Sequence, residues 1–167
     1  MAIVVEDGSI VEGANSYLSL EAVRAFALAR GVTLSSTDAL VEQQLILAAD
    51  YIESKEIRFV GYRADPENQV LCWPRNAYCV RSDEVPAKIR QAQGFLVMAQ
   101  ASATPVNILP VGSPPEPFPV TKKKLGPLEK TYAATPGAVV PTLPTVPAAE
   151  EALAFYYKRS GSRLEVY

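Results

Sequence analysis

Proline is distributed very unevenly along the chain, and this limits what its second part can fold into. Eleven of the 14 prolines lie between Pro105 and Pro147. Proline removes a backbone donor and clashes with the preceding turn inside a helix. The first part can therefore form long helices, and the second largely cannot. We expect a mainly α fold with two parts: a helical bundle body over 1–104, and an extended arm with some β-structure over 105–167 that ends in a short helix.

The size and charge of the chain narrow the class of protein. Its 167 residues are about one domain's worth, and 49% of them are hydrophobic, enough for one core. The 16 basic and 18 acidic residues give no overall attraction to nucleic acid or to an anionic membrane. No apolar run approaches the roughly 20 residues that span a bilayer, and the start lacks the features of a signal peptide. We expect a chain kept in the cytoplasm, without a membrane partner.

Apolar residues recur at helical spacing in three segments of the first part. The predicted helices are 20–30, 37–55 and 86–102. Ser19 is the expected cap of the first, and Gly31 follows its end. Ser36 is the expected cap of the second, and Pro86 suits the first position of the third.

Each predicted helix has one stripe that we expect to be buried. The stripes are Leu20, Val23, Phe26 and Ala27 in the first, Leu40, Val41, Leu45, Ala48, Tyr51 and Ile52 in the second, and Ile89, Ala92, Leu96, Ala99 and Ala103 in the third. Gly94 lies mid-helix, where it costs about 1 kcal/mol relative to alanine. A close approach between helices and chance explain it equally well.

The connection between the second and third helices is long for a structureless loop, at about 30 residues. Its aromatic content predicts a packed, specific loop. The residues expected to order it are Phe59, Tyr62, Trp73, Pro74 and Arg75. The alternation of aromatics with arginines over 58–81 also has a second interpretation, because such residues can stack bases and neutralise phosphates. We favour the packing interpretation.

The second part holds fewer regular elements. Residues 117–134 are predicted to be extended, and 137–147 polyproline-like or coil. A short helix is expected over 148–158, opened by Pro147. The terminal SRLEVY segment can pair as a strand.

The sequence offers little for catalysis. There is no histidine, the commonest general base and metal ligand. Cys72 and Cys79 have no second pair that would complete a zinc site. We expect them to be free thiols, although a disulfide between them stays open. No Gly-rich phosphate loop is present. We therefore expect a protein that is not an enzyme and has no cofactor.

Four segments together carry a resemblance to a known family. They are VEGANSYLSLEAVRAFALARG (11–31), LILAADYIES (45–54), RFVGYRADPENQVLCWPR (58–75) and EVPAKIRQA (84–92). This series resembles the head–tail connector, or neck adaptor, family of long-tailed phages. The same pattern often carries the label of a DnaT-like single-stranded-DNA-binding domain. A single-stranded-DNA-binding module is therefore the alternative to the connector.

The resemblance implies a structural protein of the virion neck, present in the host cytoplasm during assembly. It implies a homo-oligomeric ring of about twelve copies that docks on the portal protein. On its other side the ring would meet a tail-completion or stopper protein. Genomic DNA would pass through its lumen without sequence-specific binding. The residues expected at a portal or subunit contact are Lys122, Lys123, Lys124, Leu128, Tyr132, Phe155 and Tyr156.

Overall fold

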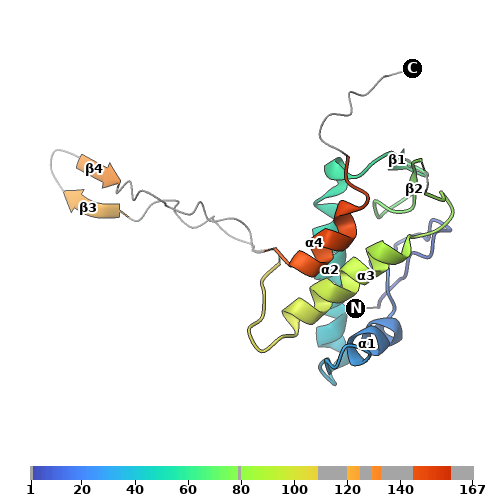
Figure 1. Ribbon diagram of the computed structural model, residues 1–167, viewed down its shortest axis with the longest axis horizontal. Helices are drawn as coiled ribbons and strands as arrows, with labels where there is room; N and C mark the ends of the chain where they lie inside the picture. Colours follow the sequence, from blue (N-terminus) through green and yellow to red (C-terminus); the bar gives the residue numbers. More distant parts are fainter. Residues whose placement is uncertain (1, 79, 109–119, 125–128, 133–144, 159–167) are drawn as a thin grey trace, which may run out of the picture.

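The computed structural model describes residues 2–78, 80–108, 120–124, 129–132 and 145–158. Its body consists of four helices (Figure 1): α1 (Leu20–Leu28), α2 (Asp38–Glu53), α3 (Ala87–Gln100) and α4 (Pro147–Ala154). The prediction of a mainly helical fold with a short helix near the C-terminus is confirmed. None of the helices in the described ranges has the length and apolar character that crossing a bilayer requires.

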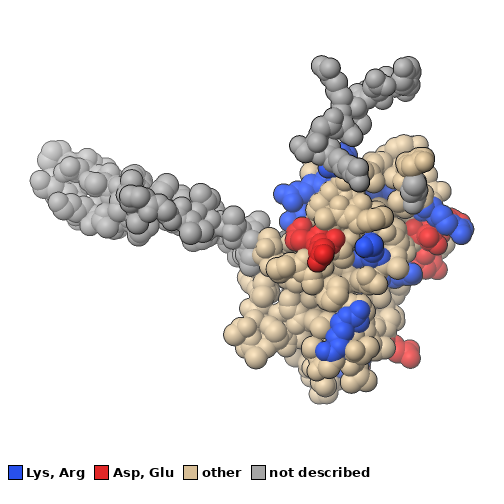
Figure 2. All heavy atoms as spheres, viewed as in Figure 1, with Lys and Arg blue, Asp and Glu red and all other residues tan. Residues whose placement is uncertain are grey.

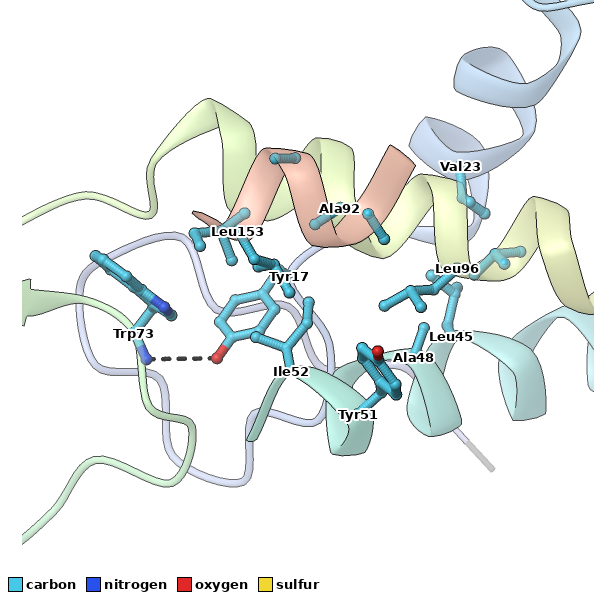
Figure 3. Packing of buried hydrophobic residues seen from close by; sticks show 14 of the residues in the cluster. Tyr17, Val23, Leu45, Ala48, Tyr51, Ile52, Trp73, Ala92, Leu96 and Leu153 are labelled. Carbon is cyan, nitrogen blue, oxygen red and sulfur yellow. Dashed lines mark hydrogen bonds between the residues drawn. The ribbon is translucent and has the colours of Figure 1, made fainter. Parts of the chain in front are cut away.

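Helix α3 lies at the centre of the body and packs against the other three helices. Its buried residues Ile89, Ala92 and Leu96 face those of α2 and α4. Figure 3 shows Ile52 and Leu153 from these helices beside Tyr17, and Trp73 on the other side of Tyr17, while Leu45 lies further along the core with Leu96. Tyr17 and Trp73 come from loops. The core therefore combines the N-terminal segment, the central loop and the α4 region.

Helix α1 begins as predicted and ends two residues early. The Ser19 hydroxyl accepts a hydrogen bond from the backbone N–H of Ala22 at 3.1 Å, which confirms Ser19 as the cap. The backbone N–H of Arg30 turns to the carbonyl of Ala27, so the chain tightens after Leu28. Gly31 then takes a φ of +73°, a conformation that glycine adopts without strain.

Helix α2 differs from the prediction at its start. It begins at Asp38 after Thr37, so the expected cap at Ser36 is wrong. The Ser35 hydroxyl instead accepts from the N–H of Thr37. Leu40 is exposed, as is Leu47 two turns further on, so both lie on a different side of α2 from the buried Val41 and Leu45. The other predicted stripe residues of α2 are buried.

Helix α3 is shorter than predicted at both ends. Pro86 precedes the helix as its cap residue, and Ala103 lies after the helix, where it is exposed. The structure decides between the two explanations of Gly94. A Cβ atom at this position would lie 2.5 Å from the Phe26 ring, so the glycine permits a close approach of α1.

Helix α4 begins at Pro147, which lies in the first turn. The helix ends at Ala154 rather than at the predicted Lys158. After α4 the chain pairs with residues 58–60. The N–H of Val60 donates to the carbonyl of Tyr156, and the N–H of Lys158 donates to the carbonyl of Arg58. Residues 156–158, which were predicted as the last turn of the helix, therefore pair with residues 58–60 instead.

Short elements complete the described part. A 3-10 helix, η1 (Glu56–Arg58), leads into the pair of β1 (Tyr62–Arg63) and β2 (Arg75–Asn76). A second antiparallel pair, β3 (Val120–Lys124) and β4 (Glu129–Tyr132), forms a hairpin in the arm. The terminal SRLEVY segment lies outside the described residues.

The division at residue 104 stays a prediction, and the core includes residues from both sides of it. Ile108 and Val146 are buried in the same cluster as the helices. We call residues 109–144, which lie between these two buried positions in the sequence, the arm segment.

Candidate functional site

The central loop, residues 59–81, places two of its aromatic rings inside the protein. Phe59 and Trp73 are fully buried and meet edge to face, with ring centroids 5.4 Å apart. Tyr156, which follows α4, packs against Trp73 at 5.0 Å. The loop's only tryptophan is thus enclosed by protein groups. Its ring is not accessible to a nucleobase.

Arg75 has its guanidinium group directed into the loop, where the residue is 4% exposed. The group donates to the carbonyl of Val60 at 3.0 Å, of Gly61 at 2.8 Å and of Cys72 at 3.3 Å. The neighbouring Pro74 is also buried, and its carbonyl accepts from the Gln69 amide. Arg75 joins the two sides of the loop and is not free to bind a phosphate.

Arg63 is likewise engaged within the loop. Its guanidinium donates to both carboxylate oxygens of Glu56, each at 2.8 Å, in a bidentate pair. This hydrogen bonding holds the pKa of Glu56 below its ordinary value. The same guanidinium donates to the carbonyl of Gln69. Arg63 and Glu56 therefore fix the loop to η1.

The exposed aromatics of the loop are tyrosines. Tyr62 is 65% exposed and Tyr78 is 96% exposed. Arg58 and Arg81 are exposed nearby in the sequence, and Arg81 pairs with Asp83 at 2.7 Å. Figure 2 shows basic and acidic side chains interspersed on the visible face of the body. This face has no large basic area of the kind that guides a nucleic-acid strand.

A buried polar cluster, Tyr17, Glu53 and Cys72, joins the N-terminal segment, α2 and the central loop. The Tyr17 hydroxyl donates to Glu53 at 2.5 Å, and the backbone N–H of Cys72 donates to the other oxygen at 2.7 Å. Burial raises the pKa of Glu53 and, more strongly, those of Cys72 and Tyr17. Cys72 is a free cysteine, and its protonated thiol is a poor nucleophile. The cluster suits packing rather than catalysis.

Gln93 is a second buried polar group, in the middle of the apolar stripe of α3. Its amide nitrogen donates to the Ser16 hydroxyl and to the carbonyl of Leu45, both at 2.9 Å. Its amide oxygen accepts from the N–H of Tyr17 at 3.0 Å. Gln93 thereby connects the N-terminal segment to α2 and α3. Sequence reasoning missed it, although a glutamine next to Ala92 in a buried stripe was the available signal.

Glu150 holds α4 against α2. Its carboxylate accepts from the hydroxyls of Tyr51 and, at 2.9 Å, of Tyr157, and it lies 3.2 Å from the Lys55 ammonium. Burial alone would raise the pKa of Glu150, but these hydrogen bonds and Lys55 outweigh it and lower the pKa. We call these four residues the α4 clasp.

Glu150→Gln should weaken the clasp. A lowered pKa means that the carboxylate stabilises the fold above its ordinary pKa of 4.5 and that this stabilisation is lost as pH falls through the lowered value. We expect a loss of about 1–2 kcal/mol in the free energy of unfolding at pH 7, which shrinks as the buffer is acidified. Urea titrations at several pH values measure it. Glu151→Gln, on the exposed side of the same helix, is the control. A pH-independent difference would contradict the assigned role.

The residues predicted at a portal or subunit contact are spread over two regions. Lys122, Lys123 and Lys124 lie in β3, Tyr132 ends β4, and Leu128 lies outside the described residues. At the other end of the chain, Tyr156 is buried against Trp73. Phe155 is 69% exposed, with the Lys88 ammonium 4.9 Å from its ring centroid. Only Phe155 of that pair is available for a partner.

The described residues contain no group of His, Cys, Asp and Glu side chains that could hold a metal ion. Comparison with protein families adds a further finding. The profile of the family described as "Putative DnaT-like ssDNA binding protein" matches residues 1–167. The chain belongs to this family. The comparison with curated proteins gave no match, and neither did the comparison with solved structures.

Membership of this DnaT-like family agrees with the label that accompanies the sequence pattern. It assigns the whole chain, arm included, to one family. Trp73 and Arg75 are both buried, so neither side chain is available to contact a nucleic acid in this fold.

Proposed function

We propose that the chain is a structural head–tail connector of a tailed phage. It forms a ring on the portal protein, meets a tail-completion or stopper protein on the other side, and surrounds the DNA channel. Such a role requires a stable body and a means of reaching other chains, and it requires no reacting group. It places the protein in the virion neck, and in the host cytoplasm during assembly.

One observation carries this proposal. The four helices and the central loop complete one core, and that core holds the arm segment at both ends, at Ile108 and Val146. The arm segment carries the β3–β4 hairpin, which Figure 1 draws apart from the helices. A subunit with this layout can keep its fold while the hairpin contacts another chain. The resemblance of residues 11–92 to neck adaptors supports the same role.

The connector proposal is tested with the portal protein encoded in the same genome. We expect the mixture to contain rings stacked on portal particles, seen by negative-stain electron microscopy. Mass photometry should give a ring mass that is a whole multiple of 18.0 kDa. A native chain that stays monomeric and unbound at all concentrations tried would contradict the proposal.

Single-stranded-DNA binding is the second candidate, and the family description favours it. Trp73→Ala or Arg75→Ala would not test it, because both residues are buried and their loss acts on folding. The accessible groups are Tyr62 and Tyr78.

Replacing both Tyr62 and Tyr78 with alanine tests the second candidate. If these rings stack on bases, affinity for a labelled oligonucleotide should fall about tenfold or more, since each stacked base contributes about 1–3 kcal/mol. Fluorescence anisotropy at low salt measures it, and binding should weaken as salt rises. Phe155→Ala, an exposed aromatic outside the loop, is the matched control. Undetectable binding by the native chain at low salt would remove this candidate.

A further inference from the structure

The β3–β4 hairpin is a two-stranded sheet whose extensive contacts are between its own strands. Its register pairs Lys122 with Thr131, Lys123 with Lys130 and Lys124 with Glu129. An isolated two-stranded hairpin is marginally stable in water. Within the part of the chain that the structure describes, no further strand pairs with either outer edge, so its backbone N–H and C=O groups can accept a partner. Contact with another protein surface would therefore stabilise the hairpin.

The charges of the hairpin indicate what that surface should be. The register places two lysines, Lys123 and Lys130, directly opposite each other, and like charges in this position destabilise a strand pair. The two strands contain four lysines and one glutamate, a net charge of +3. Pairing with a second identical hairpin would add to the repulsion. An acidic surface would relieve it.

The helical body of this chain is acidic. Its described residues, 2–78, 80–108 and 145–158, contain fifteen acidic and ten basic side chains, a net charge of −5. Basic charge is therefore concentrated in the hairpin and acidic charge in the body of the same protein. The near-neutral total hides this separation. A second copy of the chain therefore offers a body of opposite net charge to the hairpin.

We infer that the hairpin of one copy docks on the acidic helical body of a neighbouring copy. This inference rests on the proposed ring and names the contact that closes it. Hairpin-to-body docking is a head-to-tail contact, which is the type that repeats around a closed ring. Because the arm segment is held at Ile108 and at Val146, the docked hairpin ties one core to the next.

Zero-length cross-linking of mixed rings tests this contact directly. Native full-length chains are prepared with nitrogen-14 and with nitrogen-15, mixed and assembled, with the portal if the ring requires it. A carbodiimide then joins lysines to carboxylates in contact, and mass spectrometry identifies the peptides. We expect pairs of mixed isotope that join Lys122, Lys123, Lys124 or Lys130 to acidic residues of the body.

Two charge-matched double variants test the electrostatic basis. Lys122→Glu with Lys124→Glu should weaken self-association at least tenfold, as measured by analytical ultracentrifugation. Lys88→Glu with Arg90→Glu makes the same change of net charge on the body, and it should leave self-association at or above the native value. Lys122→Arg with Lys124→Arg should restore native assembly. Added salt should weaken the native ring.

The outcomes separate the inference from the proposed function. The inference would be overturned if rings form but show no hairpin cross-links, or if those cross-links stay within one copy or lead to the portal. Each of these results would leave the connector role standing. The inference would also be overturned if both double variants weakened self-association equally, or if the hairpin lysine substitutions changed DNA binding and not self-association. Failure of the native chain to assemble, alone or with portal, would overturn both.

Discussion

Trp73→Ala should lower the free energy of unfolding by about 3–5 kcal/mol, the range measured when a buried large aromatic is cut back to alanine. Trp73 is fully buried between Phe59 and Tyr156, so its removal leaves a cavity where the central loop meets α4. Small domains are stable by about 5–15 kcal/mol in total. The variant should therefore be poorly folded at 37 °C.

Urea unfolding followed by circular dichroism measures this loss. Tyr62→Ala is the matched control, because Tyr62 is an exposed aromatic in the same loop, and it should change stability by no more than about 0.5 kcal/mol. Trp73→Phe should cost less than Trp73→Ala, since the indole N–H has no hydrogen-bond partner among the described residues. A Trp73→Ala protein as stable as Tyr62→Ala would refute the packing role of this loop.

Replacing residues 109–144 with a flexible Gly–Ser linker should abolish docking on the portal and leave the body folded. Helix α4 is held to the body by its own contacts with α3 and by the hydrogen bond from Tyr51 of α2 to Glu150. Helical circular dichroism should therefore be retained. Portal binding, scored by co-sedimentation and negative stain, should be lost.

The control for this deletion is a chain whose segment 109–144 has the same composition in scrambled order. It keeps the length and charge of the arm but not the β3–β4 register. We expect it to fail in docking as the deletion does. If the deletion protein docks like the native chain, the arm has no part in the contact and the connector proposal loses its structural basis.

The helices were predictable because their signals are local. Apolar spacing, Ser19 and Gly31 all act within a few residues of the element that they define. The errors in the predicted helices lie at positions where contacts with residues distant in sequence determine the structure. Residues 58–60 pair with the chain after α4 and end that helix early. Leu40 lies with Leu47 on an exposed side of α2, although its neighbour Val41 is buried.

The candidate site shows the same division. Aromatic content identified the central loop as packed, but it did not separate buried Trp73 from exposed Tyr62. The Gln93 amide and the cluster of Tyr17 with Glu53 could not be found from one sequence, because their partners lie 36 to 77 residues away. The sequence predicted some β-structure in the arm, but the hairpin register depends on the pairing of two strands, which no local pattern specifies.

The return of the chain to its own core has a consequence for a broken backbone. If a protease cut the protein once between residues 109 and 144, the C-terminal fragment would still contain α4, Tyr156 and the clasp residue Glu150. These groups bind the N-terminal fragment through the core and through Tyr51. The two fragments would stay together in solution and separate only in denaturant, much as a two-chain protein does. A neck built from such subunits would tolerate single cuts in its arms.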